Sequence, residues 1–232
     1  MENCSAAEGF WEWGCVWDVM PALLRAAGIT LEATITAYIL ALIIGLVLAL
    51  LRRSPTRWIS TPAREVIEFL RSTPPLVQIY FIYFGAPQLG LELAAWTAGI
   101  TALSLHYSCY VAEVYRAGIE GVHEGQWEAS RALNLSSYRT YRDIVLPQAI
   151  PPIVPALGNY LIGLFKDTPM LSVIAIIELM SRAKIIGSDT FRYVEPITMV
   201  GVFFLVMSLV ASGLVQTVER RLKRLPAARA SE

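Results

Sequence analysis

Charged residues are scarce in this sequence. They make up 16% of the chain, whereas 55% of its residues are hydrophobic. Soluble domains usually carry about 25% charged residues, so the deficit excludes an ordinary soluble domain and indicates a protein that lies in lipid. The formal net charge is +0 at pH 7. No overall positive field attracts nucleic acid, and we expect no nucleic-acid partner.

Cysteine and histidine are also rare. The cysteines Cys4, Cys15 and Cys109 lack the spacing of a metal site, so we expect all three to have no special role. His106 has no acidic partner at the spacing of a catalytic triad, and we expect His123 to be solvated. Neither histidine supplies the set of groups that an intramembrane enzyme needs. The sequence therefore predicts that the chain is not an enzyme and holds no metal or cofactor.

The N-terminus lacks the basic stretch that begins a secretory signal, because acidic residues stand there instead. Its aromatic residues suit a short segment that lies in the membrane interface. We expect residues 1–28 to form such an extracytoplasmic or interfacial segment. The acidic residues are Glu2, Glu8, Glu12 and Asp18, and the aromatic residues are Phe10, Trp11, Trp13 and Trp17.

Long apolar stretches dominate the rest of the chain. Five of them are long enough to cross about 30 Å of hydrocarbon, and the fourth is the least conventional because it contains Lys166 and Asp167. The sequence therefore predicts an all-α membrane protein with five transmembrane helices. We expect these helices at residues 29–51, 67–87, 93–114, 155–179 and 194–218.

Basic residues gather in three connections, within residues 52–64, 116–142 and 220–229. Because basic loops stay in the cytoplasm, this pattern predicts an outside N-terminus and an inside C-terminus. The domain division is then a transmembrane domain at 29–219 and a basic cytoplasmic tail at 220–232. The connection between the fourth and fifth spans breaks the pattern, and we expect its basic residues to meet a charged partner outside: Arg182, Lys184 and Arg192.

One cytoplasmic connection, residues 116–147, is too patterned to be a flexible linker. Residues 126–133 are rich in helix formers, and Asn134 suits a left-handed helix terminus. Ser136 or Ser137 can cap a second short helix, which we expect to end at about Val145 because Pro147 follows. Two short helices with an apolar surface form a projection that needs a groove in a partner protein.

This connection resembles the EAA motif of importer-type ABC permeases, whose pattern is E-A-A, three residues, G, nine residues, I-x-L-P. The match is Glu128-Ala129-Ser130, Asn134 and Ile144-Val145-Leu146-Pro147. It departs from the pattern at Ser130 and Asn134, which are small or turn-tolerant. The resemblance implies a coupling helix that docks in an ATPase subunit. The implied contacts are Glu128, Ala129, Ser130, Arg131, Ala132, Leu133, Asn134, Ile144, Leu146 and Pro147.

Other segments resemble the polar amino-acid uptake group of the same family. Residues 71–78 (RSTPPLVQ) are similar to its R-G-T-P-L-L-V-Q signature, and residues 155–159 (PALGN) and 166–168 (KDT) match two further signatures. The resemblance covers about residues 28 to 220. Residues 183–187 (AKIIG) and 190–193 (TFRY) most resemble ectoine and hydroxyectoine permeases. The expected function is therefore binding-protein-dependent import of a polar amino acid or similar zwitterion, with ectoine or hydroxyectoine as the best candidate.

The resemblance also implies partners and a location. The chain lacks the G-x-x-x-x-G-K-[ST] phosphate loop, so ATP must be hydrolysed by other subunits. We expect two ATPase subunits, a second permease subunit and an extracytoplasmic solute-binding protein, in a bacterial inner membrane. Docking of the binding protein is expected at Arg182, Lys184 and Arg192.

Lys166 and Asp167 are costly at the centre of a span, where each charge costs at least about 2.5 kcal/mol. They either line the translocation path or pair with another span, for example at Glu113 or Arg71. Glu113 can also form a local salt bridge with Arg116, three residues away. The candidate path residues are Arg71, Thr73, Gln78, Glu113, Asn159, Lys166, Asp167 and Thr168.

An ion-coupled secondary transporter of a small zwitterion is the alternative. It would also place a lysine and an aspartate at the midplane of the membrane. Such carriers usually have more spans or an inverted repeat, and neither is visible in this sequence.

Overall fold

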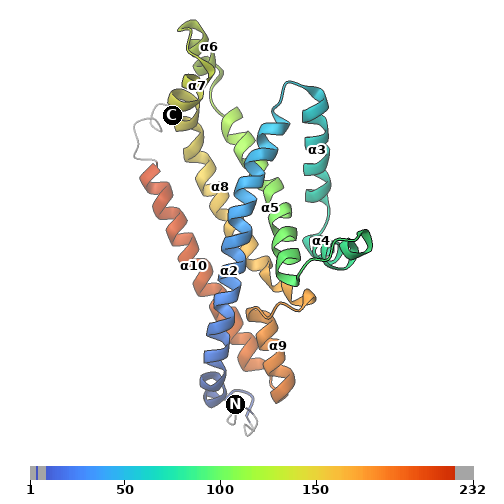
Figure 1. Cartoon of the computed structure of the whole chain (residues 1–232). Helices are drawn as coiled ribbons and strands as arrows, with labels where there is room; N and C mark the ends of the chain where they lie inside the picture. The colour runs from blue at the N-terminus through green and yellow to red at the C-terminus, as the bar shows by residue number, and fades with distance from the viewer. Residues whose placement is uncertain (1–3, 5–8, 223–232) are drawn as a thin grey trace.

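Long helices lying side by side make up most of the computed structural model, which describes Cys4 and residues 9–222. All regular structure in this described part is helical. Four helices form the bundle in Figure 1: α2 (Trp13–Arg52), α5 (Ala95–Glu120), α8 (Leu146–Asp167) and α10 (Val194–Leu222). The shorter helices are α3 (Arg57–Ser72), α4 (Pro75–Tyr80), α6 (Glu124–Ala132), α7 (Ser137–Arg139) and α9 (Leu179–Thr190).

Four further helical turns connect these elements. Two are π-helical, where the hydrogen bonds are spaced one residue wider than in an α-helix, and two are 3₁₀-helical. They are η1 (π, Phe81–Gly85), η2 (3₁₀, Ala86–Leu89), η3 (π, Thr140–Val145) and η4 (3₁₀, Thr168–Ile174).

Three helical stretches among the described residues are long and apolar enough to cross a membrane: Trp13–Arg52, Ser137–Ile174 and Val194–Leu222. The last agrees with the expected span at 194–218. The first begins well before the expected span at 29–51, so the domain boundary predicted at residue 28 falls inside α2.

The second expected span, at 67–87, is broken in the structure. α3 ends at Ser72, and Thr73 and Pro74 are both extended before α4 begins. Two consecutive prolines explain the break, because proline disfavours a helical conformation in the residue before it and cannot donate a backbone hydrogen bond. The helix is therefore fully interrupted at Pro74-Pro75. Figure 1 shows α4 turned away from the line of α3.

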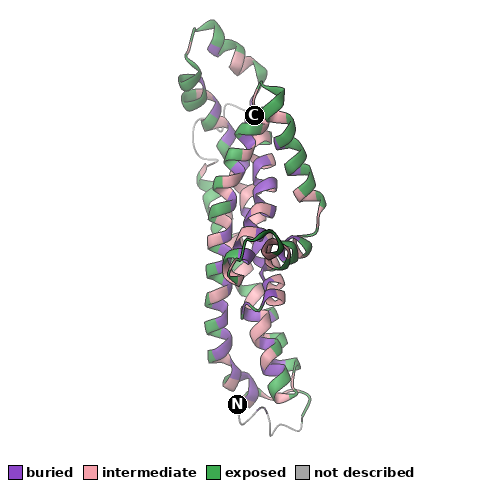
Figure 2. Ribbon diagram, turned by 45° about the vertical axis from the view of Figure 1, so that its right-hand side comes forward, coloured by how far each residue is buried: buried purple, intermediate pink, exposed green. Residues whose placement is uncertain are grey.

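The helical pair α2 and α5 forms the most extensive contact in the bundle. A buried stripe of small residues runs along α2 at every fourth position, which places the residues on one face of the helix. Small residues let two backbones approach closely in a membrane. The stripe consists of Ala33, Ala37, Ala41, Gly45 and Ala49. Buried residues elsewhere also line the inner sides of the long helices (Figure 2).

Ion pairs join α2 and α5 at one end of the bundle. Glu113 pairs with Arg52 and, at 2.8 Å, with Arg116, and Arg53 lies 3.6 Å from Glu120. The local pair of Glu113 with Arg116 confirms the sequence prediction. This basic end also carries α6 and α7 (Figure 1). The expected tail beyond Leu222 lies outside the described residues.

The opposite end of the bundle holds a disulfide. Cys4 and Cys15 are bonded, with their Cα atoms 4.3 Å apart, whereas Cys109 is free and buried. The expectation that Cys4 and Cys15 have no special role is therefore wrong. They are separated by 11 positions in sequence, and the bond joins Cys4 to the first turn of α2.

The small-residue stripe generates a prediction for Gly45. A Cβ atom at Gly45 would lie 2.6 Å from Val111 Cγ1 and 2.8 Å from the Ser108 carbonyl oxygen. The second contact is to backbone, so α2 and α5 must move apart. We expect Gly45→Ala to cost about 1–3 kcal/mol of stability, measured as a lower melting temperature of the purified protein in detergent.

Gly28 provides the matched control on the same helix, because a Cβ atom there meets nothing within 4 Å. Gly28→Ala should melt no lower than the unsubstituted protein. Equal melting temperatures for the two variants would contradict the close packing of α2 on α5.

Candidate functional site

The basic end carries an exposed helical projection, which we define as residues 121–147. His123 caps the start of α6, since its Nδ1 accepts a hydrogen bond of 3.1 Å from the Gly125 amide. Trp127 of α6 contacts the Tyr141 ring edge-on, with centroids 5.5 Å apart. This contact holds α6 against η3.

The turn after α6 has the left-handed geometry that the sequence predicts. Asn134 has a φ of 53°. The Leu135 amide donates to the Ser130 carbonyl at 3.0 Å, and the Asn134 amide donates to the Arg131 carbonyl at 2.9 Å. These two bonds form a Schellman motif, which satisfies the carbonyls at the end of a helix. Asn134 therefore ends α6 sharply and turns the chain toward α7.

The second helix of the projection does not end where the sequence predicts. Ser136 caps α7 as expected, through a 3.4 Å hydrogen bond from the Arg139 amide. The chain then continues through η3 into α8, with Pro147 in the first turn of α8. Proline has no N–H to donate, and the wider π-helical spacing of η3 lets the helix continue despite that loss. The end predicted at Val145 is wrong.

Most of the ten expected ATPase contacts are open to solvent. Leu133 is 71% exposed, and the neighbouring Tyr138 is 70% exposed. Ser130 is buried instead, and its hydroxyl donates to the Gln126 carbonyl at 2.6 Å. Ile144 and Pro147 are half-buried. The exposed members are Glu128, Ala129, Arg131, Ala132, Leu133, Asn134 and Leu146.

A second group of polar residues lies inside the bundle, where the break between α3 and α4 faces α5. The buried Gln78 donates from Nε2 to the Leu70 carbonyl and to Thr73 Oγ1, both at 2.7 Å. Gln78 Nε2 also lies 3.2 Å from His106 Nδ1. The other amide atom, Gln78 Oε1, is buried and has no hydrogen-bond partner among the described residues.

Arg71 lies beside this group. Its guanidinium carbon is 5.2 Å from the centre of the Tyr110 ring, within the range of a cation–π contact. Arg71 also lies 3.8 Å from Glu68. Its Nε atom is buried without a hydrogen-bond partner in the described part of the chain. One of its donors is therefore unused.

Asp167 accepts a 2.8 Å hydrogen bond from the Tyr107 hydroxyl. Lys166 is exposed and forms no ion pair or hydrogen bond with any described residue. The sequence left open an ion pair of Lys166 or Asp167 with Glu113 or Arg71. Neither residue forms that pair in the described part of the chain. Thr168 is buried, and its hydroxyl donates to the Phe165 carbonyl at 2.8 Å.

Aromatic rings connect these residues into one polar–aromatic cluster. The His106 ring lies 5.2 Å from the Tyr110 ring, which lies 5.3 Å from the Tyr160 ring of α8. Sequence reasoning missed these rings, although the i, i+1 and i+4 spacing of His106, Tyr107 and Tyr110 was a usable signal. The cluster consists of Arg71, Thr73, Gln78, His106, Tyr107, Tyr110, Tyr160 and Asp167. Of the other expected path residues, Asn159 is exposed on α8 and Glu113 lies at the basic end.

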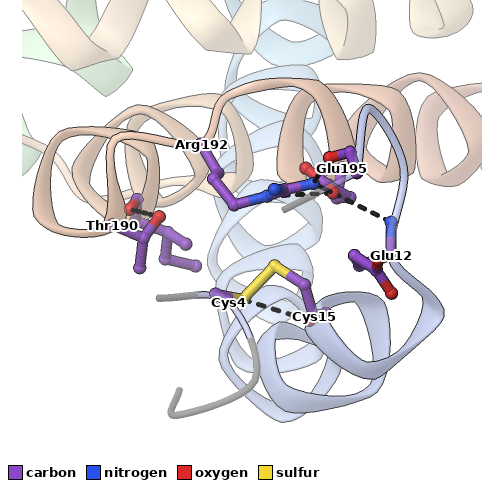
Figure 3. The surroundings of a disulfide bond; sticks show 8 residues. Cys4, Glu12, Cys15, Thr190, Arg192 and Glu195 are labelled. Atoms are coloured by element: carbon purple, nitrogen blue, oxygen red, sulfur yellow. Dashed lines mark hydrogen bonds and ion pairs between the residues drawn. A yellow bond between two sulfur atoms is a disulfide. The ribbon is translucent and has the colours of Figure 1, made fainter. Parts of the chain in front are cut away.

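At the opposite end, Arg192 holds the N-terminal segment onto α10 (Figure 3). Its Nε donates to Glu195 at 3.1 Å, and its Nη2 donates to the Gly9 carbonyl at 2.9 Å. The Glu12 amide donates to the same Glu195 oxygen at 3.1 Å. The bond to Glu195 raises the pKa of the Arg192 guanidinium. Of the three expected docking residues, Lys184 is exposed and Arg182 and Arg192 are half-buried.

Comparison with known proteins gives one family. The model of the binding-protein-dependent transport system inner membrane component matches residues 19–224. The probable amino-acid ABC transporter permease protein y4tG of Sinorhizobium fredii is 42% identical over 91% of this chain and 96% of its own length. The arginine transport system permease protein ArtQ of Bacillus subtilis is 37% identical over 88% and 94%. The glutamine transport system permease protein GlnP of Escherichia coli is 36% identical over 92% and 99%.

Solved structures agree with this result. A chain in the crystal structure of an amino acid ABC transporter with histidines has a TM-score of 0.86 and 38% identity, and the match covers 91% of this chain and 99% of that one. A chain of the inward-facing MetNI methionine ABC transporter has a TM-score of 0.76 at 20% identity, over 89% and 99%. The second match supports the fold alone.

The positive φ of Asn134 generates a prediction about the projection. Asn134→Ala places a Cβ-bearing residue without a local hydrogen-bonding side chain in the left-handed region, which costs about 1 kcal/mol or more. Asn134→Gly carries no such strain and is the matched control. We expect amides of residues 130–136 to exchange with deuterium about fivefold faster in the alanine variant than in the glycine variant. Equal exchange in the two variants would contradict the turn geometry.

Proposed function

The chain belongs to the family of binding-protein-dependent transport system inner membrane components, and on that premise we propose that its helical projection couples an amino-acid importer to ATP. The chain is a permease subunit of an amino-acid ABC importer in the inner membrane. It is not itself an enzyme, since ATP is hydrolysed by a separate subunit. This membership removes the alternative of an ion-coupled secondary transporter.

The observation that carries the coupling proposal is the exposed apolar surface of the projection. Leu133 and Tyr138 present large apolar side chains to solvent, and the Schellman turn at Asn134 keeps α6 at a set angle. Glu128 and Arg131 add exposed charges to the same helix. A rigid surface of this kind fits a groove in an ATPase subunit. Two ATPase subunits and a second permease subunit complete the proposed assembly.

The proposed orientation places the projection in the cytoplasm and the N-terminus outside. Arg52 and Arg53 of α2, the start of α3 and the projection share one end of the bundle (Figure 1), and basic connections stay in the cytoplasm. The disulfide lies at the other end, and disulfides persist in oxidising compartments. The proposed arrangement has five spans. They are the three long apolar stretches, α5, and α3 together with α4 as one interrupted span. The outer end, with Lys184 and Arg182, would receive the solute-binding protein.

We place the translocation path at the polar–aromatic cluster. Arg71 has an unused donor suited to a carboxylate, and Asp167 has an acceptor suited to an ammonium group. Opposite charges at separate positions suit a zwitterion. Two of the relatives named above transport arginine and glutamine, so a polar amino acid is the proposed solute. Ectoine is favoured only by the similarity of residues 183–187 and 190–193 and is the weaker candidate.

ATP dependence is the first consequence of this proposal. The importer assembled with its ATPase subunits and reconstituted in vesicles should take up solute when ATP is supplied. Uptake should persist when sodium and proton gradients are collapsed by ionophores, because the energy enters through the ATPase. Uptake driven by an ion gradient in vesicles without ATP would overturn the proposal.

A charge reversal at Glu128 tests the coupling surface. Glu128→Arg should leave folding and membrane insertion intact, because the side chain is exposed. It should reduce solute-stimulated ATP hydrolysis by tenfold or more, since reversing a charge across a specific interface costs several kcal/mol. The measurement is the hydrolysis rate of the assembled complex with and without solute and binding protein.

Glu124→Arg is the matched control. Glu124 is exposed in the first turn of the same helix but lies before the motif residues. Normal stimulated hydrolysis is expected in that variant. Normal stimulation in Glu128→Arg as well would contradict the docking role of Glu128.

A further inference from the structure

Glu32 is the one carboxylate within the apolar stretch 29–51 of α2, near its outer end. It stands twenty residues before Arg52, which at 1.5 Å per residue is about 30 Å along the helix. This distance equals the thickness of the hydrocarbon layer, so with Arg52 at the inner boundary Glu32 lies at the outer one. A carboxylate at the edge of the hydrocarbon is a functional candidate when no partner neutralises it. Glu32 forms no hydrogen bond or ion pair with any described residue.

A hollow of about 490 Å³ lies in front of this carboxylate. It is within the range of small-molecule sites. Its lining brings together α2, the start of α5 and the connection between η4 and α9. The residues are Ile29, Glu32, Trp96, Ile176 and Ile177.

The walls of the hollow are held in place by packing and by one long-range hydrogen bond. The Leu179 amide, at the start of α9, donates to Thr30 Oγ1 at 3.1 Å. Thr30 and Leu179 are both fully buried. Ile29 and Trp96 pack against the same core cluster that contains Ile176. The helix positions that carry Glu32 and Trp96 are therefore set by the packed core and not by a flexible loop.

The chemistry of the lining selects a cation on an aliphatic stem. A carboxylate binds an ammonium or guanidinium group through charge-assisted hydrogen bonds. An indole is the best aromatic partner for a cation. The three isoleucine side chains cover methylene groups and offer no hydrogen bond. An anion would be repelled, and a neutral polar head would leave the Glu32 charge unpaired.

We propose that Glu32 and Trp96 form an outer site that binds the cationic side chain of an incoming amino acid. The site rests on the proposed function, because it takes the solute on its way from the binding protein to the polar–aromatic cluster. It favours solutes with a guanidinium or ammonium group at the end of an aliphatic chain over neutral solutes of equal length. This preference acts before the solute reaches Asp167.

The test compares arginine with citrulline, which has the same stem and an uncharged ureido head. Equilibrium binding of both is measured on the assembled permease–ATPase complex in nanodiscs of phosphatidylglycerol, without binding protein. We expect arginine to bind at least tenfold more tightly than citrulline. Glu32→Gln should remove this difference, and Trp96→Leu should reduce it several-fold while keeping the apolar wall.

Glu92→Gln is the matched control, because Glu92 is exposed shortly before Trp96 but does not line the hollow. It should keep the full preference for arginine. Equal arginine binding by the unsubstituted complex and Glu32→Gln would overturn the proposal. So would a lower melting temperature of Glu32→Gln without solute, which would assign Glu32 to a pair with another subunit. Loss of arginine binding when phosphatidylethanolamine is added would assign the site to a lipid headgroup and also overturn it.

ATP-driven arginine uptake, measured on the same complex in vesicles, tests the proposed function separately from the outer site. Normal binding with the expected variant pattern but no ATP-driven uptake would contradict the proposed function alone. ATP-driven uptake together with unchanged binding in Glu32→Gln would contradict the outer site alone.

Discussion

The close approach of α2 and α5 is the contact on which the rest of the bundle depends. Gly45 has no room for a side chain against Val111 and the Ser108 carbonyl, so the two backbones nearly touch along the small-residue stripe. In a membrane, where lipid tails are as apolar as leucine, such packing replaces the hydrophobic effect as the force that joins helices. α5 carries His106, Tyr107 and Tyr110, so its position on α2 also sets the position of the polar–aromatic cluster.

The pair of α2 and α5 runs between the two ends of the bundle, and these ends are held by different interactions. Ion pairs of Arg52 and Arg53 with α5 fix the basic end, from which the projection extends. At the other end, Arg192 and Glu195 hold residues 9–12 at the start of α10, and the disulfide bonds Cys4 to α2. The polar–aromatic cluster lies between these ends, beside the break between α3 and α4. A displacement of the projection can therefore reach the cluster through packed helices, as alternating access by rigid-body rocking requires.

Hydropathy and turn chemistry predicted much of this arrangement, because both are local. The last span, the left-handed Asn134 and the pair of Glu113 with Arg116 needed only neighbouring residues. Non-local contacts could not be predicted in the same way. The partner of Asp167 is Tyr107, sixty residues away, and the Cys4–Cys15 bond depends on how the chain folds back on α2. Pro147 misled the prediction because a π-helical turn, which leaves no clear mark in sequence, lets the helix continue.

In the assembled importer, the projection is expected to lie against an ATPase subunit. This contact is tested with a photo-crosslinking residue at position 133, which is 71% exposed at the end of α6, in the assembled importer. A second complex carries it at position 209, which is 62% exposed on the apolar face of α10. We expect a crosslink from position 133 to the ATPase subunit and none to that subunit from position 209. Crosslinks from position 133 that reach only lipid, or only the binding protein, would contradict it.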